Sequence, residues 1–281
     1  MFWLTALVAL ALCGSSAPSQ STSTLPAPAV VRAPAGMENV GVEWRRIEIR
    51  EGGTILMAVA RPAGPGPFPA VVILHGSHGF AREYVQLAKE LAENGVVAVA
   101  PCWFAPGSGP GRRFVSPVKC PAATPPMADH HSQRANQTVE SIVQAVRALP
   151  SVRSDQIALF GHSRGGGATW NFLLKGGDAQ ALILNSAGYP DEVIRRAGEF
   201  NAPLLILHGE RDGPGDPSGG GAMTDVRRAR AFQDALRNAG KPVDAVYYPT
   251  GQHNSLWTDP AQHADEVQHM KSFLNRHLRG N

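Results

Sequence analysis

The sequence of 281 residues has few charged side chains and no apolar run long enough to span a bilayer. Charged residues make up 17% of the chain, the formal net charge is +3, and Lys and Arg are scattered among acidic residues. A nucleic-acid-binding surface needs clustered basic side chains, so nucleic acid is not an expected partner. The apolar run at residues 2–13 is shorter than the roughly 20 residues of a membrane-spanning helix. With 43% hydrophobic residues, the composition is that of an ordinary globular protein. The length fits one large domain.

Acidic and basic side chains are absent before Arg32. The apolar run followed by small residues predicts a signal peptide over 1–17, hence export to the periplasm or the medium, with no stable membrane insertion after cleavage. No Lys or Arg precedes the run, so a disordered or interfacial N-terminus is the alternative. The following residues are rich in Ser, Thr, Pro and Ala, which predicts a flexible tether over 18–42 and a folded domain over 43–281.

The sequence has only three cysteines. If residues 1–17 are removed, Cys102 and Cys120 remain, and an even pair in an oxidising compartment can form a disulfide. Both lie in or beside a stretch rich in Pro and Gly that a bridge would tether. Because spacing along the chain does not fix the distance between the sulfur atoms, a disulfide and two free thiols are both open.

Short apolar runs alternate with segments of helical periodicity over most of the chain. This alternation predicts an α/β fold with a mostly parallel central sheet flanked by helices. Strands are expected at 44–50, 54–62, 68–76, 96–101, 156–160, 181–185, 203–209 and 244–249, and helices at 83–93, 136–149, 165–174, 225–239 and 264–278.

Two long segments rich in Gly and Pro, 103–131 and 213–223, interrupt this alternation. Each follows the end of a strand, where ligands bind in open α/β sheets. These loops are therefore expected to shape a substrate cleft. The segment 185–200 is too short for a large cap domain, so we expect an accessible site.

The motif GHSRG, residues 161–165, lies between a predicted strand and a predicted helix. In this context G-x-S-x-G predicts a nucleophile elbow, a strained turn that exposes Ser163 at the start of a helix. Gly161 and Gly165 would let neighbouring segments approach closely, and the helix N-terminus would favour negative charge that develops near the serine. A Gly-rich turn without a catalytic role is the alternative.

A serine hydroxyl is a weak nucleophile at neutral pH, so it needs a base and a carboxylate that orients the base. Asp212 follows the run LLILHG and His253 follows DAVYYP, each just past a later predicted strand. We therefore expect Ser163, Asp212 and His253 to form a catalytic triad. Asp216 and Asp225 are the alternative acids.

The other histidines near these motifs have simpler interpretations. His162 precedes the serine and is expected to point away from it, as a packing or hydrogen-bonding group. His263 and His269 lie beyond Pro260, in a segment typical of a surface helix, and are expected to be solvated or packed.

Acyl transfer also needs two N–H donors for the oxyanion. One should be the backbone N–H of Arg164, which follows Ser163. The motif HGSHG, residues 75–79, follows a buried strand, and the backbone N–H of Ser77 is the candidate for the second donor. If 75–79 is a simple Gly-rich turn, the N–H of His78 is the alternative.

Two histidine pairs, His75 with His78 and His130 with His131, are possible metal ligands. We identify no Cys or carboxylate at ligand spacing beside either pair, and a serine triad needs no metal. The sequence thus predicts neither a metal site nor a cofactor.

The motifs GHSRGG, LLILHGERD, HGSHG and QHN together resemble those of the dienelactone hydrolase family of α/β hydrolases, over residues 68–281. The sequence is similar also to bacterial polyester hydrolases and cutinases. The resemblance implies an α/β-hydrolase fold without a large cap, and an acyl-enzyme formed on Ser163 from a small-molecule or polymeric ester.

Dienelactone hydrolases proper have cysteine at the elbow, so Ser163 favours general carboxylic ester hydrolysis over lactone hydrolysis. A serine peptidase or amidase with the same triad is one alternative. A non-catalytic binding protein on the same fold is the other, because a fold does not fix a function.

Overall fold

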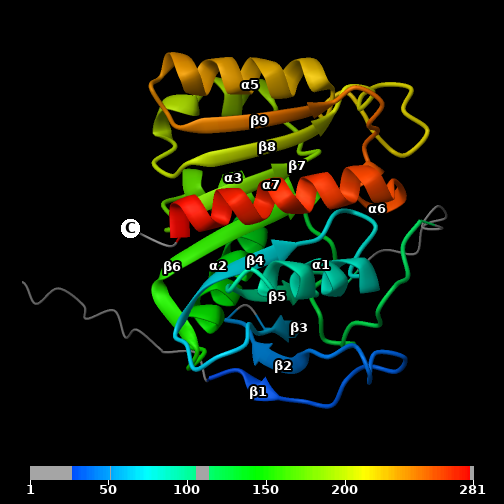
Figure 1. Cartoon of the computed structure of the whole chain (residues 1–281), viewed down its shortest axis with the longest axis vertical. Helices are drawn as coiled ribbons and strands as arrows, with labels where there is room; N and C mark the ends of the chain where they lie inside the picture. Colours follow the sequence, from blue (N-terminus) through cyan, green and yellow to red (C-terminus); the bar gives the residue numbers. More distant parts are fainter. Residues whose placement is uncertain (1–26, 51, 106–113, 279–281) are drawn as a thin grey trace, which may run out of the picture.

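The computed structural model describes residues 27–50, 52–105 and 114–278. In these residues nine strands form one sheet in the order β1-β2-β3-β5-β4-β6-β7-β8-β9 (Figure 1). The predicted signal peptide, 1–17, and the first part of the predicted tether lie outside the described residues. The strands are β1 (Ala29–Val30), β2 (Glu43–Glu48), β3 (Thr54–Ala60), β4 (Phe68–Leu74), β5 (Val97–Pro101), β6 (Val152–His162), β7 (Ala181–Asn185), β8 (Leu204–Gly209) and β9 (Val243–Tyr248).

The larger part of the sheet, from β5 to β9 in spatial order, is parallel. Strands β1, β2 and β3 extend it in antiparallel pairing. Every residue of β5, β7 and β8 is buried, because parallel strands covered on both faces consist of continuous apolar runs. The structure confirms the mostly parallel α/β sheet expected from the sequence.

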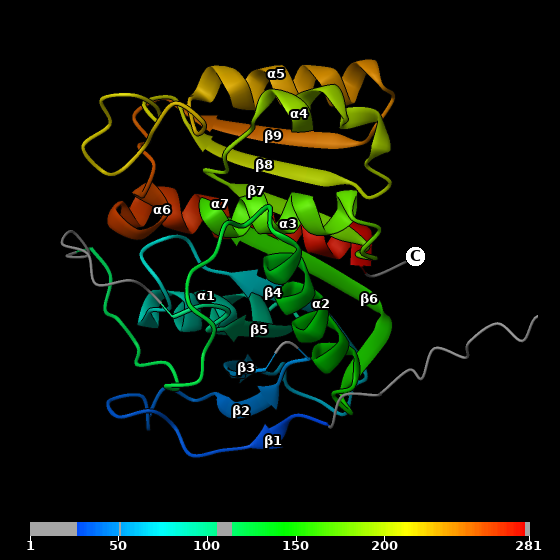
Figure 2. The ribbon, with the colours of Figure 1, turned by 180° about the vertical axis from the view of Figure 1, so that it is seen from behind.

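Helices cover both faces of the sheet. On one face lie α1 (Arg82–Ala92) and α7 (Pro260–Leu278), as Figure 1 shows; α2 (Gln133–Arg147), α3 (Arg164–Leu174) and α4 (Asp191–Arg195) lie on the other, as Figure 2 shows. Side chains alternate along β6, so Leu159 joins the core on the α3 side and Phe160 the core on the α7 side. The helix α5 (Val226–Asn238) packs into the first of these cores through Phe232.

Residues before 43 also belong to the fold. Strand β1 pairs with β2, since Ala29 lies opposite Arg46 and Val30 opposite Arg45. Met37 is also buried. Part of the predicted tether, 18–42, is therefore held against the sheet.

The last helix starts at Pro260, four residues earlier than expected. Pro is compatible with the first turn of a helix because the missing N–H needs no partner there. Asp259 caps this turn, because its Oδ1 accepts hydrogen bonds from the N–H groups of Ala261 and Gln262 at 3.0 and 3.1 Å. Pro260 is thus the first residue of the helix.

The segment between β7 and β8 contains only α4 and the short 3₁₀ helix η1 (Ala197–Glu199). As expected, this segment forms no large cap over the sheet. The short helix α6 (Ser255–Thr258), which precedes α7, was not expected from the sequence.

None of the helices in the described parts of the chain combines the length and the apolar character needed to cross a membrane.

A disulfide joins Cys102, at the end of β5, to Cys120, and their Cα atoms are 6.1 Å apart. Of the two alternatives left open by the sequence, the structure contains the bridge. It ties Cys120 to the end of β5, where Cys102 is fully buried.

Reduction of this disulfide should destabilise the protein. A link across a separation of 18 residues restricts the unfolded chain and is worth about 3 kcal/mol. Thermal unfolding should show a lower midpoint after reduction, and the Cys102→Ser/Cys120→Ser variant should match the reduced protein without responding to reductant. An unchanged midpoint after confirmed reduction would contradict this expectation.

Candidate active site

Ser163 occupies a sharp turn between β6 and α3. Its backbone dihedral angles are φ 53° and ψ −116°, a strained conformation for a residue with a Cβ. The turn is held by two hydrogen bonds: the Ser163 N–H donates to the Asn185 carbonyl at 2.9 Å, and the Gly167 N–H donates to the Ser163 carbonyl at 3.1 Å. The side chain consequently lies at the N-terminus of α3, as a nucleophile elbow requires.

Two glycines make this turn sterically possible. A Cβ on Gly161 would lie 2.3 Å from the backbone of Gly165, and a Cβ on Gly165 would lie 2.1 Å from the Leu74 carbonyl oxygen. Both distances are far inside van der Waals contact. The start of α3 therefore packs directly on the end of β4, as the GHSRG motif predicted.

The structure brings Ser163, Asp212 and His253 together. His253 Nε2 lies 2.9 Å from Ser163 Oγ, and His253 Nδ1 lies 2.9 Å from Asp212 Oδ2. Asp212 follows β8 and His253 follows β9, so the three side chains meet at the carboxyl ends of the parallel strands. Asp212 and His253 are buried, while the serine is partly exposed.

The Asp212 carboxylate has donors on both oxygens. Oδ1 accepts a hydrogen bond from the Thr224 hydroxyl at 2.6 Å, and Oδ2 lies 2.9 Å from His253 Nδ1 and 3.3 Å from His208 Nε2. Burial acts to raise the pKa of Asp212, but the hydrogen bonds and charges of His208 and His253 hold that pKa well below its ordinary value. The carboxylate is thus ionised at neutral pH and can stabilise positive charge on the His253 ring.

Sequence reasoning missed His208 and Thr224. His208 Nε2 donates to the Thr224 carbonyl at 2.6 Å, which links the two residues beside Asp212. A histidine that interrupts the apolar run LLILHG was the available signal for His208. Thr224 follows a Gly-rich loop, where the sequence carries no comparable signal.

The two alternative acids do not orient the His253 ring. Asp216 accepts a hydrogen bond from the backbone N–H of His253 at 2.7 Å, so it fixes the loop instead. Asp225 caps α5, because its Oδ1 accepts from the N–H of Arg227 at 2.9 Å.

His162 points away from the serine, as expected. Its Nδ1 lies 2.5 Å from Asn185 Oδ1 and its Nε2 lies 3.0 Å from Asn254 Oδ1. His263 Nε2 on α7 lies 2.7 Å from the Glu90 carboxylate on α1, so this ring pairs with an acid outside the proposed triad.

Ser77 and Arg164, whose N–H groups are the predicted oxyanion donors, line one cavity with Ser163. Within the described residues, no group accepts a hydrogen bond from the Ser77 N–H. The Arg164 side chain donates from Nε to Ser77 Oγ at 3.1 Å, which ties the loop 75–79 to the start of α3. The assignment of the two N–H groups to an oxyanion hole stays a prediction.

The cavity at Ser163 has a volume of about 170 Å³. His130 and His131 from the loop 103–131 line it, and so does Met223 from the loop 213–223. Both loops thus contribute to a cleft, as expected. A larger cavity, about 450 Å³, lies among α1, α6 and α7, and no residue of the proposed triad lines it.

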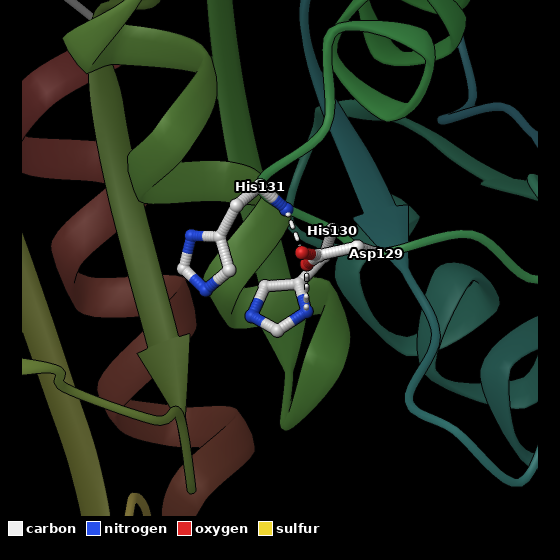
Figure 3. Close-up of side chains that lie close together, drawn as sticks. All are labelled: Asp129, His130 and His131. Carbon is white, nitrogen blue, oxygen red and sulfur yellow. Dashed lines mark hydrogen bonds and ion pairs between the residues drawn. The ribbon is translucent and has the colours of Figure 1, made fainter.

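The expectation that no carboxylate accompanies the histidine pairs is wrong for His130 and His131. Asp129 offers a carboxylate oxygen within 4.8 Å of one ring nitrogen of each histidine. Figure 3 shows the Asp129 carboxylate beside both histidines: it accepts a hydrogen bond from the His131 N–H at 3.0 Å and lies 3.7 Å from His130 Nδ1.

A cation of the protein itself faces this cluster. Arg164 Nη1 donates to the Ala128 carbonyl at 2.8 Å and lies 3.3 Å from His130 Nδ1, which can accept from it. Burial, together with the charges of His131 and Arg164, lowers the pKa of His130 to about 4. A metal ion at this nitrogen would have to displace the guanidinium, so the geometry favours a neutral His130 that braces Arg164.

The sequence matches the model of the dienelactone hydrolase family over residues 55–278. The chain belongs to this family. The match confirms the resemblance expected from the motifs, and it identifies the protein as related to hydrolases.

Curated relatives of this dienelactone hydrolase family member are distant. A putative carboxymethylenebutenolidase of Methylorubrum extorquens is 27% identical over 218 residues, which covers 72% of this chain and 68% of that protein. The uncharacterized peptidase YuxL of Bacillus subtilis is 23% identical over 261 residues, or 79% of this chain. The chain spans only 36% of the length of that peptidase.

Solved structures share the fold. A putative dienelactone hydrolase from Klebsiella pneumoniae aligns with a TM-score of 0.63 at 19% identity, covering 83% of this chain and 98% of its own. A dienelactone hydrolase-like promiscuous phosphotriesterase from metagenomic libraries gives 0.65 at 17% identity, covering 84% and 99%. Thermogutta terrifontis esterase 2 gives 0.61 at 16% identity, covering 84% and 94%. At these identities the similarity shows an α/β-hydrolase fold.

The contact between α3 and β4 should tolerate no side chain at residue 165. Gly165→Ala forces a methyl group into the Leu74 carbonyl, and overpacking of this kind costs about 3 kcal/mol or more. Gly198→Ala is a matched control, because its Cβ would meet only the Ala239 Cβ at 3.8 Å. Urea unfolding should show a large loss for Gly165→Ala and a small change for the control; equal midpoints would refute the steric argument.

Proposed function

We propose that this protein is a serine hydrolase that cleaves carboxylic esters through an acyl-enzyme on Ser163. The proposal is carried by the unbroken hydrogen-bond chain from the Ser163 hydroxyl through His253 to the buried Asp212 carboxylate. A serine hydroxyl becomes an effective nucleophile at neutral pH when a positioned imidazole accepts its proton.

In the first half-reaction His253 Nε2 accepts the Ser163 proton while Oγ attacks the carbonyl carbon of the ester. Asp212 accepts from Nδ1–H, so the ring presents its Nε2 lone pair to the serine, and the carboxylate stabilises the imidazolium. His253 then returns the proton to the leaving alkoxide. The alcohol departs and the acyl group stays on Ser163.

In the second half-reaction water replaces the alcohol. His253 removes a proton from the water as it attacks the acyl carbon, and then protonates Ser163 Oγ as the carboxylic acid leaves. The scheme uses no cofactor.

The oxyanion formed in both halves requires hydrogen-bond donors that are already in place. The N–H groups of Ser77 and Arg164 are the proposed donors. The N-terminus of α3 adds partial positive charge at the same position.

A peptidase or amidase is the second candidate, because two of the relatives are named uncharacterized peptidases of Bacillus subtilis. The same triad can cleave amides when His253 protonates the leaving amine. We favour esters because an alkoxide leaves with less assistance than an amine does.

Export forms part of the same proposal. The disulfide between Cys102 and Cys120 supports it, because such bridges persist in oxidising compartments. The predicted signal peptide, 1–17, lies outside the described residues.

Replacement of the nucleophile tests the proposal directly. Ser163→Ala should lower kcat for short p-nitrophenyl esters by about 10⁴-fold or more, with an unchanged unfolding midpoint. Ser154→Ala, an exposed serine on the same strand β6, is the matched control and should keep full activity. Turnover by Ser163→Ala equal to that of the control would remove the proposed nucleophile.

A matched pair of substrates separates the candidates. For the same acyl group, the p-nitrophenyl ester should be hydrolysed with a higher kcat/KM than the p-nitroanilide, because the ester has the better leaving group. A preference for the anilide would favour the peptidase. Failure of a fluorophosphonate probe to label Ser163 would favour a binding protein without catalytic activity.

A further inference from the structure

A chain of buried polar side chains runs behind Ser163 and His253. Glu266 Oε2 on α7 lies 2.5 Å from Asn185 Nδ2. The other atom of this amide, Asn185 Oδ1, lies 2.5 Å from His162 Nδ1. His162 Nε2 lies 3.0 Å from Asn254 Oδ1. All four of these residues are buried, with at most 4% of their surface exposed. This hydrogen-bonded chain of side chains ends at Asn254, whose amide donates to the Ser218 carbonyl.

Every member except Glu266 adjoins a residue of the proposed triad. The Asn185 carbonyl accepts the N–H of Ser163 at 2.9 Å. His162 directly precedes Ser163, and its ring centroid lies 5.4 Å from that of His253. Asn254 directly follows His253. A shift in this chain would therefore move both reacting side chains.

Hydrogen counting shows that an ionised Glu266 and a neutral His162 cannot satisfy the chain. If the carboxylate accepts from the Asn185 amide, the Asn185 oxygen faces His162 Nδ1, which must then carry a hydrogen. His162 Nε2 must also carry one, because it faces the Asn254 oxygen while the Asn254 nitrogen donates to Ser218. A neutral imidazole has a single N–H, so one contact would place two acceptors against each other.

One further proton removes the conflict. On Glu266, the proton makes a carboxylic acid that donates to the Asn185 oxygen; the turned amide donates to His162 Nδ1, and Nε2–H donates to Asn254. On His162, the proton makes an imidazolium that donates at both nitrogens. The two arrangements contain the same number of protons and carry no net charge.

Burial favours the first arrangement. Desolvation raises the pKa of Glu266 to about 8. Desolvation and the charge of His253 lower the pKa of His162 to about 3. The proton is therefore more stable on the carboxylic acid than on the imidazole.

The other groups that face Glu266 leave this order unchanged. Gln262 on the same helix donates to Oε1 at 2.7 Å. Among the described residues, none forms an ion pair with Glu266. The nearby titratable groups are His263, whose ring bonds Glu90 of α1, Asp265, and Tyr248 of β9, whose hydroxyl donates to Asp265.

We propose that Glu266 is a positioning residue of the site: it holds one proton in the chain to His162, and the uncharged chain keeps Ser163 and His253 in register. The positioning role rests on the proposed function, because it presupposes that Ser163 and His253 react. The bound proton is a property of the folded protein and can be tested without it.

The pH dependence of stability tests the bound proton. The pKa of Glu266 rises from 4.5 to about 8 on folding, so the folded state binds more protons and stability should fall as pH rises through this window. Glu266→Gln cannot ionise, and its amide can donate to Asn185. The difference between the unfolding midpoint of Glu266→Gln and that of wild type should therefore grow in favour of the variant up to about pH 8 and then stay constant.

Glu140→Gln, which removes a carboxyl group from α2 on the opposite face of the sheet, is the control and should give a curve parallel to wild type. Parallel curves for Glu266→Gln and wild type would overturn the proposal. The infrared spectrum gives a second readout that needs no variant: a band of protonated carboxylic acid at neutral pH that disappears above pH 8 is expected, and its absence would also overturn the proposal.

Ester hydrolysis tests the positioning role. Wild-type kcat should fall about tenfold between about pH 7 and pH 9 with little change in KM. Glu266→Gln should keep kcat within about twofold at about pH 7 and lose this fall. A folded but inactive Glu266→Gln, or an alkaline fall that the variant retains, would refute the role. If Ser163→Ala remains active, the proposed function fails, while the unfolding and infrared results still decide where the proton is held.

Discussion

The direct contact between the start of α3 and the end of β4 is the constraint on which the site depends. At Gly165 the helix backbone lies where any Cβ would overlap the Leu74 carbonyl. The chain enters the helix this close to the sheet through a residue with positive φ, Ser163 at 53°. The turn points the hydroxyl out of the sheet layer, toward the loops that follow β8 and β9. Two backbone hydrogen bonds offset the strain at this residue.

Buried polar side chains around this turn require partners, because an unsatisfied polar group in a low-dielectric interior is costly. Asp212 meets this requirement with donors on both oxygens, from Thr224 and His253. On the other side of the serine, Asn185 connects Glu266 to His162 by the same kind of contact. The proposed triad thus lies between two hydrogen-bonded chains. Each chain therefore restrains one flank of the site before any substrate arrives.

The central strands and the elbow could be predicted from the sequence because their causes are local. A strand buried on both faces is a continuous apolar run, and β7 was predicted with its observed bounds, Ala181–Asn185. The glycines of the elbow follow from steric contact within a few residues. β1 escaped prediction because two residues carry no periodicity, and it exists only by pairing with β2. Likewise, the side chain of Glu266 is indistinguishable in sequence from that of any helix acid, and only packing of α7 on the sheet buries it.

The walls of the cavity depend on Arg164, the residue after the serine. Its backbone begins α3, while its side chain reaches Ser77 in one loop and Ala128 with His130 in another. The part of this loop that the structure describes is thereby held at Ala128 and His130 by hydrogen bonds of the guanidinium, and at Cys120 by the disulfide to Cys102. Because the same residue begins the helix behind the serine and braces the wall facing it, the position of the reacting oxygen and the shape of the cavity are coupled. A change in this loop would alter the position of the oxygen and the shape of the cavity together. Proteins with the same fold but different loops can therefore differ in substrate.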